Sequence, residues 1–212
     1  MTKNLNHHYS KKEEQLNVVS HGFGLLLSMI AFPFLVIKAF DFEGLWKPVS
    51  FLIYGLSMII LYAASTFYHA AKNPKKRRKL NILDHAAIYV LIAGSYSPFC
   101  LVALDSDLGW YMFLFVWIFA LTGIILKLFF TGRFDKISTA MYLLMGWQVM
   151  FFIKPLMNSL SAEGFNYLLA GGIFYSVGAI LYSIKKIPYN HAIFHLFVLL
   201  GSLSHFLAIY NL

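Results

Sequence analysis

Cysteine and charged side chains are both scarce in this chain. A single cysteine, Cys100, among 212 residues excludes a disulfide within the chain and a metal site built from cysteine pairs. Only 12% of the residues are charged, whereas a soluble domain has about 25% charged residues. The composition therefore argues against a soluble protein and leaves Cys100 as a packing residue.

Apolar and aromatic residues are abundant in the chain. Hydrophobic residues make up 59% of the chain and aromatic residues 18%, and the mean hydropathy is +0.68. The net charge of +8 raises the question of nucleic acid, but the basic residues fall in short connections between apolar runs. We therefore expect no nucleic-acid partner and assign these charges to orientation in a bilayer.

Apolar runs of the length that spans a bilayer, about 20 residues, recur along the chain. The sequence predicts an all-α integral membrane protein, a bundle of seven transmembrane helices in one domain, residues 17–212, after a polar cytoplasmic segment, residues 1–16. With no small-residue cleavage site after the first run, we expect that span to be retained. The predicted spans are 17–39, 46–69, 80–104, 108–131, 138–157, 165–184 and 190–211.

Charge asymmetry predicts the orientation of this bundle. Seven spans place the termini on opposite sides, and fourteen of the seventeen lysines and arginines then fall on the side of the N-terminus. The run Lys75–Lys79 is the densest part of that excess. By the positive-inside rule the N-terminus is cytoplasmic and the C-terminus lies outside.

A histidine pair begins the last predicted span. His191 and His195 are four residues apart, so both imidazoles lie on one helix face. Pro188 and Asn190 precede them and predict a helix start, with Asn190 as its N-cap. The spacing suits a two-histidine metal clamp, but such a pair can also bind neighbouring carbonyl groups or lie at the level of the lipid headgroups.

Two further polar residues fall at the same membrane depth as this pair. His69 ends the second span and Asp84 begins the third, and the predicted orientation puts both on the cytoplasmic side. Ionisable residues inside spans are costly and indicate function. The agreement in depth favours a metal site formed by His69, His191 and His195.

Zinc is the metal that this set predicts. Three histidines leave a fourth position on zinc for water, and zinc lowers the pKa of that water to about 7. Asp84 then serves as a general base or fixes a ligand through a hydrogen bond, and Ser65, one turn before His69, donates into the site.

The remaining histidines carry weaker predictions. His21 begins the first span at the same level and is a candidate to line the site. His85 points about 100° away from Asp84 and is expected to be packed or interfacial. His205 lies on the face of His191 but about 21 Å farther along the helix, too far to share an ion.

Three motifs in this order resemble those of the progestin and adipoQ receptor family. Ser65–His69 (STFYH) resembles its S-x-x-x-H motif, Leu83–His85 with Gly94–Phe99 resembles its third-helix aspartate motif, and His191–His195 (HAIFH) resembles its last-helix H-x-x-x-H. Residues 19–24 (VSHGFG) are similar to the bacterial hemolysin III branch. The resemblance covers nearly the whole chain.

The resemblance implies a seven-helix fold in the cell membrane, the plasma membrane for a bacterial protein, with zinc on the three histidines and Asp84 and Ser65 around the water. The wider superfamily includes membrane hydrolases, which implies hydrolysis of a lipid amide or ester. Two alternatives stay open: a lipid or membrane-state sensor with structural zinc, and a pore. The pore is the least favoured of these functions, because the strongest polar cluster is confined to one end of the bundle. The long cytoplasmic domain of the animal receptors is missing, so hormone recognition is not expected.

Overall fold

The described part of the chain contains seven helical spans that are long and apolar enough to cross a membrane. The computed structural model describes residues 9–131 and 135–212, so residues 1–8 of the predicted polar segment lie outside it. Every described element is helical, as the sequence predicts. The elements are α1 (Lys11–Ala39), α2 (Trp46–Ala70), α3 (Pro74–Pro98) continued by η1 (Phe99–Ala103), α4 (Asp107–Phe130), α5 (Asp135–Gly146), η2 (Trp147–Phe152), α6 (Ile153–Ser159), α7 (Ala162–Ser183) and α8 (Asn190–Tyr210).

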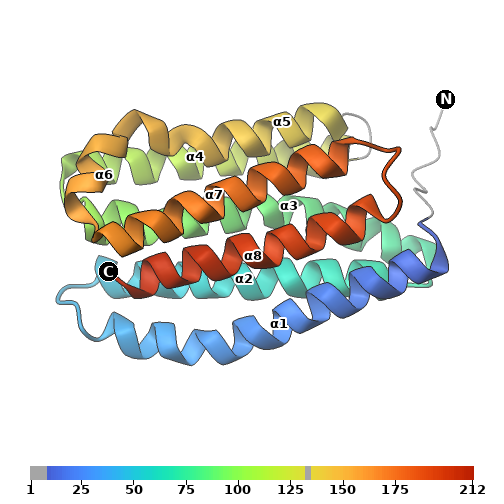
Figure 1. Cartoon of the computed structure of the whole chain (residues 1–212), viewed down its shortest axis with the longest axis horizontal. Helices are drawn as coiled ribbons and strands as arrows, with labels where there is room; N and C mark the ends of the chain where they lie inside the picture. Colours follow the sequence, from blue (N-terminus) through green and yellow to red (C-terminus); the bar gives the residue numbers. More distant parts are fainter. Residues whose placement is uncertain (1–8, 132–134) are drawn as a thin grey trace.

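The spans run side by side along the long axis of the molecule, and consecutive spans point in opposite directions (Figure 1). The closest neighbours are α1 with α2, α2 with α3 and α7 with α8, and α8 also packs against α1. Of the seven spans, α3 with η1 is the most enclosed, because 72% of the residues in its apolar stretch are buried. The helix that carries Asp84 is therefore an inner helix of the bundle.

Two helices begin before the apolar runs that predicted them. Helix α1 begins at Lys11, because the Ser10 side chain accepts a hydrogen bond from the Glu13 amide and two glutamates occupy the first turn. Helix α3 begins at Pro74, where the Asn73 side chain accepts from the amides of the next turn. Capping residues are polar, so a search for apolar length stops short of them.

The start of α8 differs from its prediction. Its N-cap is Tyr189, which has a left-handed backbone with φ of 56°, so the expectation that Asn190 caps the helix is wrong. The Asn190 side chain instead donates to the carbonyl oxygens of Tyr182, at 2.7 Å, and Ile184, at 3.4 Å. Asn190 thus holds the end of α7 against the start of α8.

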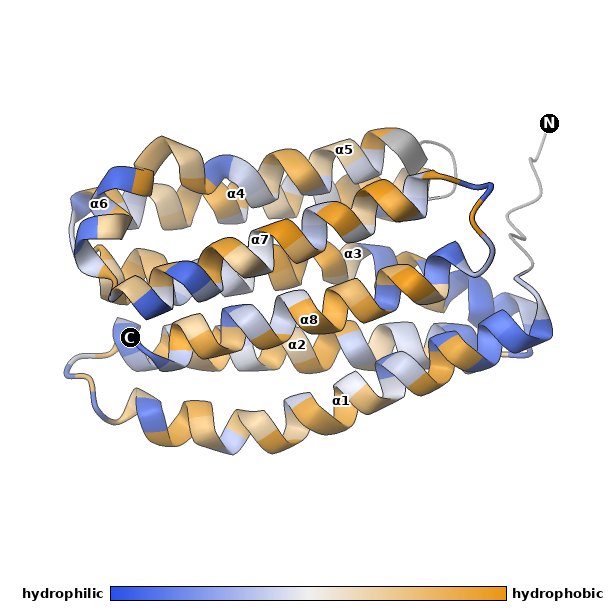
Figure 2. Cartoon of the chain, viewed as in Figure 1, coloured by the Kyte–Doolittle hydropathy of each residue, from blue (hydrophilic) through white to orange (hydrophobic). Residues whose placement is uncertain are grey.

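One end of the bundle collects the residues of the predicted metal site, and we call it the polar end. The starts of α1, α3 and α8 and the end of α2 lie together at the end where the described chain begins (Figure 1). Hydrophilic residues gather there and also at the opposite end, around α6 and the start of α7, whereas the middle of the spans is mainly apolar (Figure 2). All the residues of the predicted metal site belong to the polar end.

Candidate metal centre

Three histidines from two helices meet at the polar end of the bundle. His69 comes from the last turn of α2, and His191 and His195 come from the first two turns of α8. All three are buried, and one ring nitrogen of each lies within 4.8 Å of the others. Among the described residues this is the one such group of three histidine, cysteine or acidic side chains.

The spacing of these nitrogens fits a shared ion. The Nε2 atoms of His69 and His191 are 3.1 Å apart, and two nitrogens on one tetrahedral ion at 2.0–2.1 Å are about 3.4 Å apart. Neutral imidazoles present lone pairs that transition metals bind. The buried cluster therefore has the composition and the geometry to hold a metal ion.

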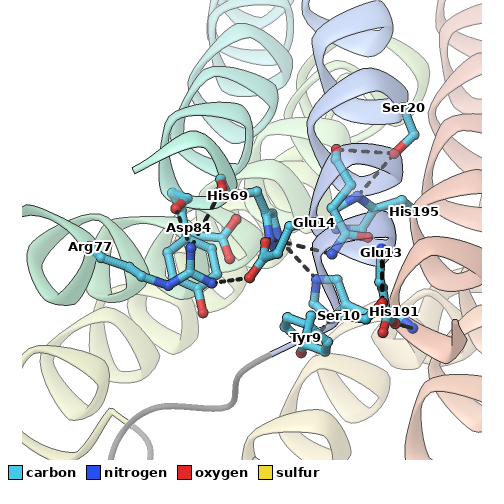
Figure 3. Close-up of polar contacts among 12 residues, drawn as sticks. Tyr9, Ser10, Glu13, Glu14, Ser20, His69, Arg77, Asp84, His191 and His195 are labelled. Atoms are coloured by element: carbon cyan, nitrogen blue, oxygen red, sulfur yellow. Dashed lines mark hydrogen bonds and ion pairs between the residues drawn. The ribbon is translucent and has the colours of Figure 1, made fainter. Parts of the chain in front are cut away.

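Each of these histidines has a partner on its outer nitrogen, and all three partners come from α1 or the residues just before it. The Nδ1 atom of His69 is 2.7 Å from a Glu14 carboxylate oxygen, and the Nδ1 atom of His191 is 2.9 Å from the Tyr9 hydroxyl (Figure 3). The Nδ1 atom of His195 is 3.2 Å from the Ser20 hydroxyl. Burial raises the pKa of Tyr9, so its hydroxyl stays neutral.

Charged contacts fix the first turn of α1 at this position. The Arg77 guanidinium donates to the other oxygen of Glu14 (Figure 3) and to the carbonyl oxygens of Tyr68 and His69, at 3.3 and 3.5 Å. Glu13 accepts from the backbone amide of His191 at 3.3 Å. A positive charge therefore lies at the carbonyl groups that end α2, and a negative charge lies at the amide groups that begin α8, as the helix dipoles favour.

The sequence reasoning missed this outer layer. Glu14 and Asn17 share a helix face with His21, which was predicted to line the site, because the three are spaced by three and four residues. The Asn17 side chain lies 3.4 Å from the Nδ1 atom of His69. A helical periodicity of polar residues running ahead of the apolar stretch is the signal that identifies this face. Glu14 was missed because residues 1–16 were assigned to a polar segment outside the bundle.

Asp84 and Ser65 lie beside the cluster. Both side chains are buried, and the Ser65 hydroxyl lies beside the Asp84 carboxylate. They line the same cavity as His191 and His195, and Asp84 points toward the histidines from α3 (Figure 3). The structure thus places the two residues predicted for catalysis next to the three predicted to bind metal.

The other histidines differ in how they relate to the site, and His85, predicted to point away from Asp84, lies with its Nδ1 atom 3.7 Å from the Asp84 carboxylate and lines the same cavity. The His21 ring stacks on His195, with centroids 3.4 Å apart and planes 8° apart, so His21 borders the cluster. His85 donates from Nδ1 to its own helix, to the Asn81 carbonyl oxygen at 2.8 Å. His205 packs edge-on against Tyr175 with centroids 5.3 Å apart, away from the cluster.

A long cavity opens from the cluster into the apolar part of the bundle. It offers about 190 Å³ to the centres of water-sized molecules. Its lining runs from His191 to His205, which are about 21 Å apart along α8, and most of it is apolar. Examples from the far part of the lining are Phe152, Leu156, Phe165 and Leu168. The histidine cluster that could hold a metal therefore lies at one end of a cavity that is mainly apolar along the rest of its length.

These features define a polytopic membrane protein with a buried three-histidine centre. The sequence profile of the Haemolysin-III related family matches residues 9–206, and the chain belongs to this family. It is 49% identical over 201 residues to the "Hemolysin-3 homolog" of Bacillus subtilis (strain 168), which covers 95% of this chain and 94% of that protein. It is 48% identical over 198 residues to "Hemolysin-3" of Bacillus cereus, covering 93% and 90%.

A more distant likeness extends to animals. The chain is 27% identical over 205 residues to the human "Monocyte to macrophage differentiation factor", covering 94% of this chain and 84% of that protein. The membership agrees with the family resemblance of the three motifs.

Proposed function

We propose that this protein is a zinc-dependent hydrolase of a lipid amide or ester, embedded in the cell membrane. One observation carries the proposal: the buried three-histidine cluster, with Asp84 beside it, stands at the polar end of a cavity whose remaining length is apolar. A carbonyl group placed at the cluster leaves room for an acyl chain along the cavity. Membrane lipids are therefore the proposed substrates and partners.

The residues of the chain have separate tasks in this scheme. His69, His191 and His195 are the proposed ligands, and zinc bound by three histidines supplies an activated water and polarises a carbonyl oxygen. The Asp84 carboxylate takes a proton from the attacking water and returns it to the leaving group. Ser65, which lies beside that carboxylate, is proposed to orient it. The apolar lining binds the acyl chain and keeps bulk water out.

We infer that the centre faces the cytoplasm. The basic run Lys75–Lys79 begins α3, at the same end of the bundle as the histidine cluster. Lysine and arginine are enriched on the cytoplasmic side of membrane proteins, and the predicted topology assigns fourteen of the seventeen basic residues to the end that holds the cluster. The scheme therefore puts product release at the cytoplasmic leaflet.

A lytic pore is the second candidate, because one relative is named Hemolysin-3 and another Hemolysin-3 homolog. A water-filled pore needs polar groups along its whole length. The lining of this cavity beyond the cluster includes His205 but is otherwise mainly apolar. Purified protein in liposomes is therefore expected to retain a trapped dye, and dye release that depends on the protein would favour the pore.

Turnover by a matched pair of aspartate variants tests the hydrolase. Zinc-loaded protein in detergent is incubated with labelled lipid amides and esters, and fatty-acid release is measured. Asp84→Asn is expected to lower release by about 10²–10⁴-fold, the usual contribution of a general base, while zinc content is kept. Asp107→Asn, on the exposed first turn of α4, is the control and should match the wild type.

The outcomes separate the hydrolase from the sensor with structural zinc. Zinc-loaded wild type that releases no fatty acid from any of these lipids counts against hydrolysis and favours the sensor. Loss of zinc or of the fold in Asp84→Asn assigns Asp84 a structural task. Full activity in that variant removes Asp84 from the mechanism.

A further inference from the structure

A carboxylate from α1 reaches the outer nitrogen of His69. Glu14 Oε2 lies 2.7 Å from the Nδ1 atom of His69 (Figure 3), and the His69 side chain is fully buried while Glu14 is 20% exposed. We propose that Glu14 is a positioning residue of the centre, which holds His69 in the tautomer and the ring orientation that metal binding needs. This inference rests on the metal site proposed above but not on hydrolysis.

The geometry sets the proton on one nitrogen. A carboxylate only accepts hydrogen bonds, so the hydrogen between Glu14 and His69 is on Nδ1. The Nε2 atom of the same ring then carries a lone pair, and this is the atom that faces Nε2 of His191 at 3.1 Å. Glu14 thus aims the lone pair of His69 at the centre of the cluster.

Glu14 is itself held from its other oxygen. Arg77 pairs with Oε1, while Oε2 remains for His69. Arg77 is anchored in turn by two carbonyl oxygens at the end of α2 and by its stack on the Tyr68 ring, 4.6 Å from the ring centroid. The carboxylate therefore keeps one orientation, as a residue that orients another must.

The partners of the other two histidines are weaker. Ser20 and Tyr9 contact His195 and His191 through neutral hydroxyl groups at 3.2 and 2.9 Å. A hydrogen bond to a carboxylate is shorter and about twice as strong as a neutral one. It also makes the imidazole a better donor to a metal. Of the three outer contacts, the one made by Glu14 should matter most for affinity.

Zinc affinity is the measurement that tests this role. Detergent-purified protein is stripped of metal, and zinc is titrated in competition with a chromophoric chelator. Replacing an outer partner of a metal-binding histidine typically weakens the metal by about 10–100-fold, and this range is expected for Glu14→Ala. Glu14→Gln should fall between Ala and wild type, because an amide oxygen still accepts from Nδ1 but without the charge.

Two further variants distinguish positioning from simple bracing of the helices. Arg77→Gln breaks the link between α1 and α3 but leaves Glu14 on His69, so it should lower the melting temperature of the metal-free protein while changing zinc affinity less than Glu14→Ala does. Glu43→Gln, at an exposed position before α2 at the opposite end of the bundle, is the matched control and should bind zinc like the wild type.

The tautomer of His69 gives a second measurement, which would not change if Glu14 only held the helices together. Nitrogen-15 spectra of histidine-labelled, metal-free protein should place the His69 proton on Nδ1 in the wild type and on a mixture of both nitrogens in Glu14→Ala.

The proposal is overturned if Glu14→Ala binds zinc as tightly as the wild type, or no more weakly than Arg77→Gln. A wild type that binds no zinc overturns this proposal and the metal site together, whereas a zinc-binding wild type without hydrolytic activity counts against the proposed function alone.

Discussion

The Nε2 atoms of His69 and His191 lie 3.1 Å apart, although 122 residues separate the two side chains in the sequence. His195 brings a third imidazole nitrogen within 4.8 Å. Buried polar atoms need partners, and a metal ion that accepts a lone pair from each ring satisfies all three together. The arrangement leads directly to a prediction about metal content.

Wild-type protein purified in detergent is expected to hold about one zinc ion per chain, measured by elemental analysis. His69→Ala and His191→Ala should each lose it, because two imidazoles remain. His205→Ala is the matched control, since it removes a histidine from the same helix about 21 Å away, and it should keep the metal. Absence of zinc from well-folded wild type, even after resupply, would refute the metal centre.

The stack of His21 on His195 gives a test of the ligand number. Neither ring nitrogen of His21 has a hydrogen-bond partner among the described residues, and its ring is also edge-on to Tyr62 at 5.1 Å. His21→Phe keeps the ring and removes two buried polar atoms. We expect unchanged zinc content and a melting temperature no lower than wild type, because an apolar group of the same shape replaces unsatisfied ones. Zinc loss in this variant would instead make His21 a ligand.

The cavity can be shortened at Gly172 on α7. This residue lines the cavity, and a Cβ atom built there meets nothing within 4 Å. Gly172→Phe is expected to lower the hydrolysis of long-chain lipids more than that of short-chain ones, because the ring occupies the space of the distal acyl chain. Gly172→Ala adds one methyl group and should leave turnover unchanged. Equal loss for all chain lengths would show that the acyl chain takes another path.

The orientation is testable because Cys100, the single cysteine of the sequence, is buried. Cysteines introduced at exposed Lys72, before α3, and at exposed Glu43, before α2, lie at opposite ends of the bundle. In intact cells a membrane-impermeant maleimide should label Glu43→Cys and spare Lys72→Cys. Lysis should expose both, and the reverse pattern in intact cells would place the centre outside.

Apolar length predicted all seven spans, because crossing a membrane depends on a local property that any window of about 20 residues reveals. The starts of α1 and α3 were less accessible to the same reasoning, since Ser10 and Asn73 cap these helices with polar side chains outside the apolar runs. Asn190 was misread because a residue that favours the N-cap position found better acceptors on α7.

The candidate site divides in the same way. His191 and His195 were predictable because a spacing of four residues places both on one helix face whatever the rest of the chain does. His69, Ser65 and Asp84 were brought in by depth, which follows from the order of spans. Glu14 and Tyr9 were missed, because hydrogen bonds to histidines far along the chain depend on how α1 lies against α2 and α8.

The sequence by itself determined the class of protein, the number of its spans and the residue types available to a metal, since hydropathy and helical periodicity are local. Only the tertiary structure decided that Glu14 meets His69, that His21 stacks on His195, and that an apolar cavity leads away from the cluster. Those contacts follow from the rotation and axial shift of each helix. Both are set by close packing over the whole bundle, which no single segment of the chain encodes.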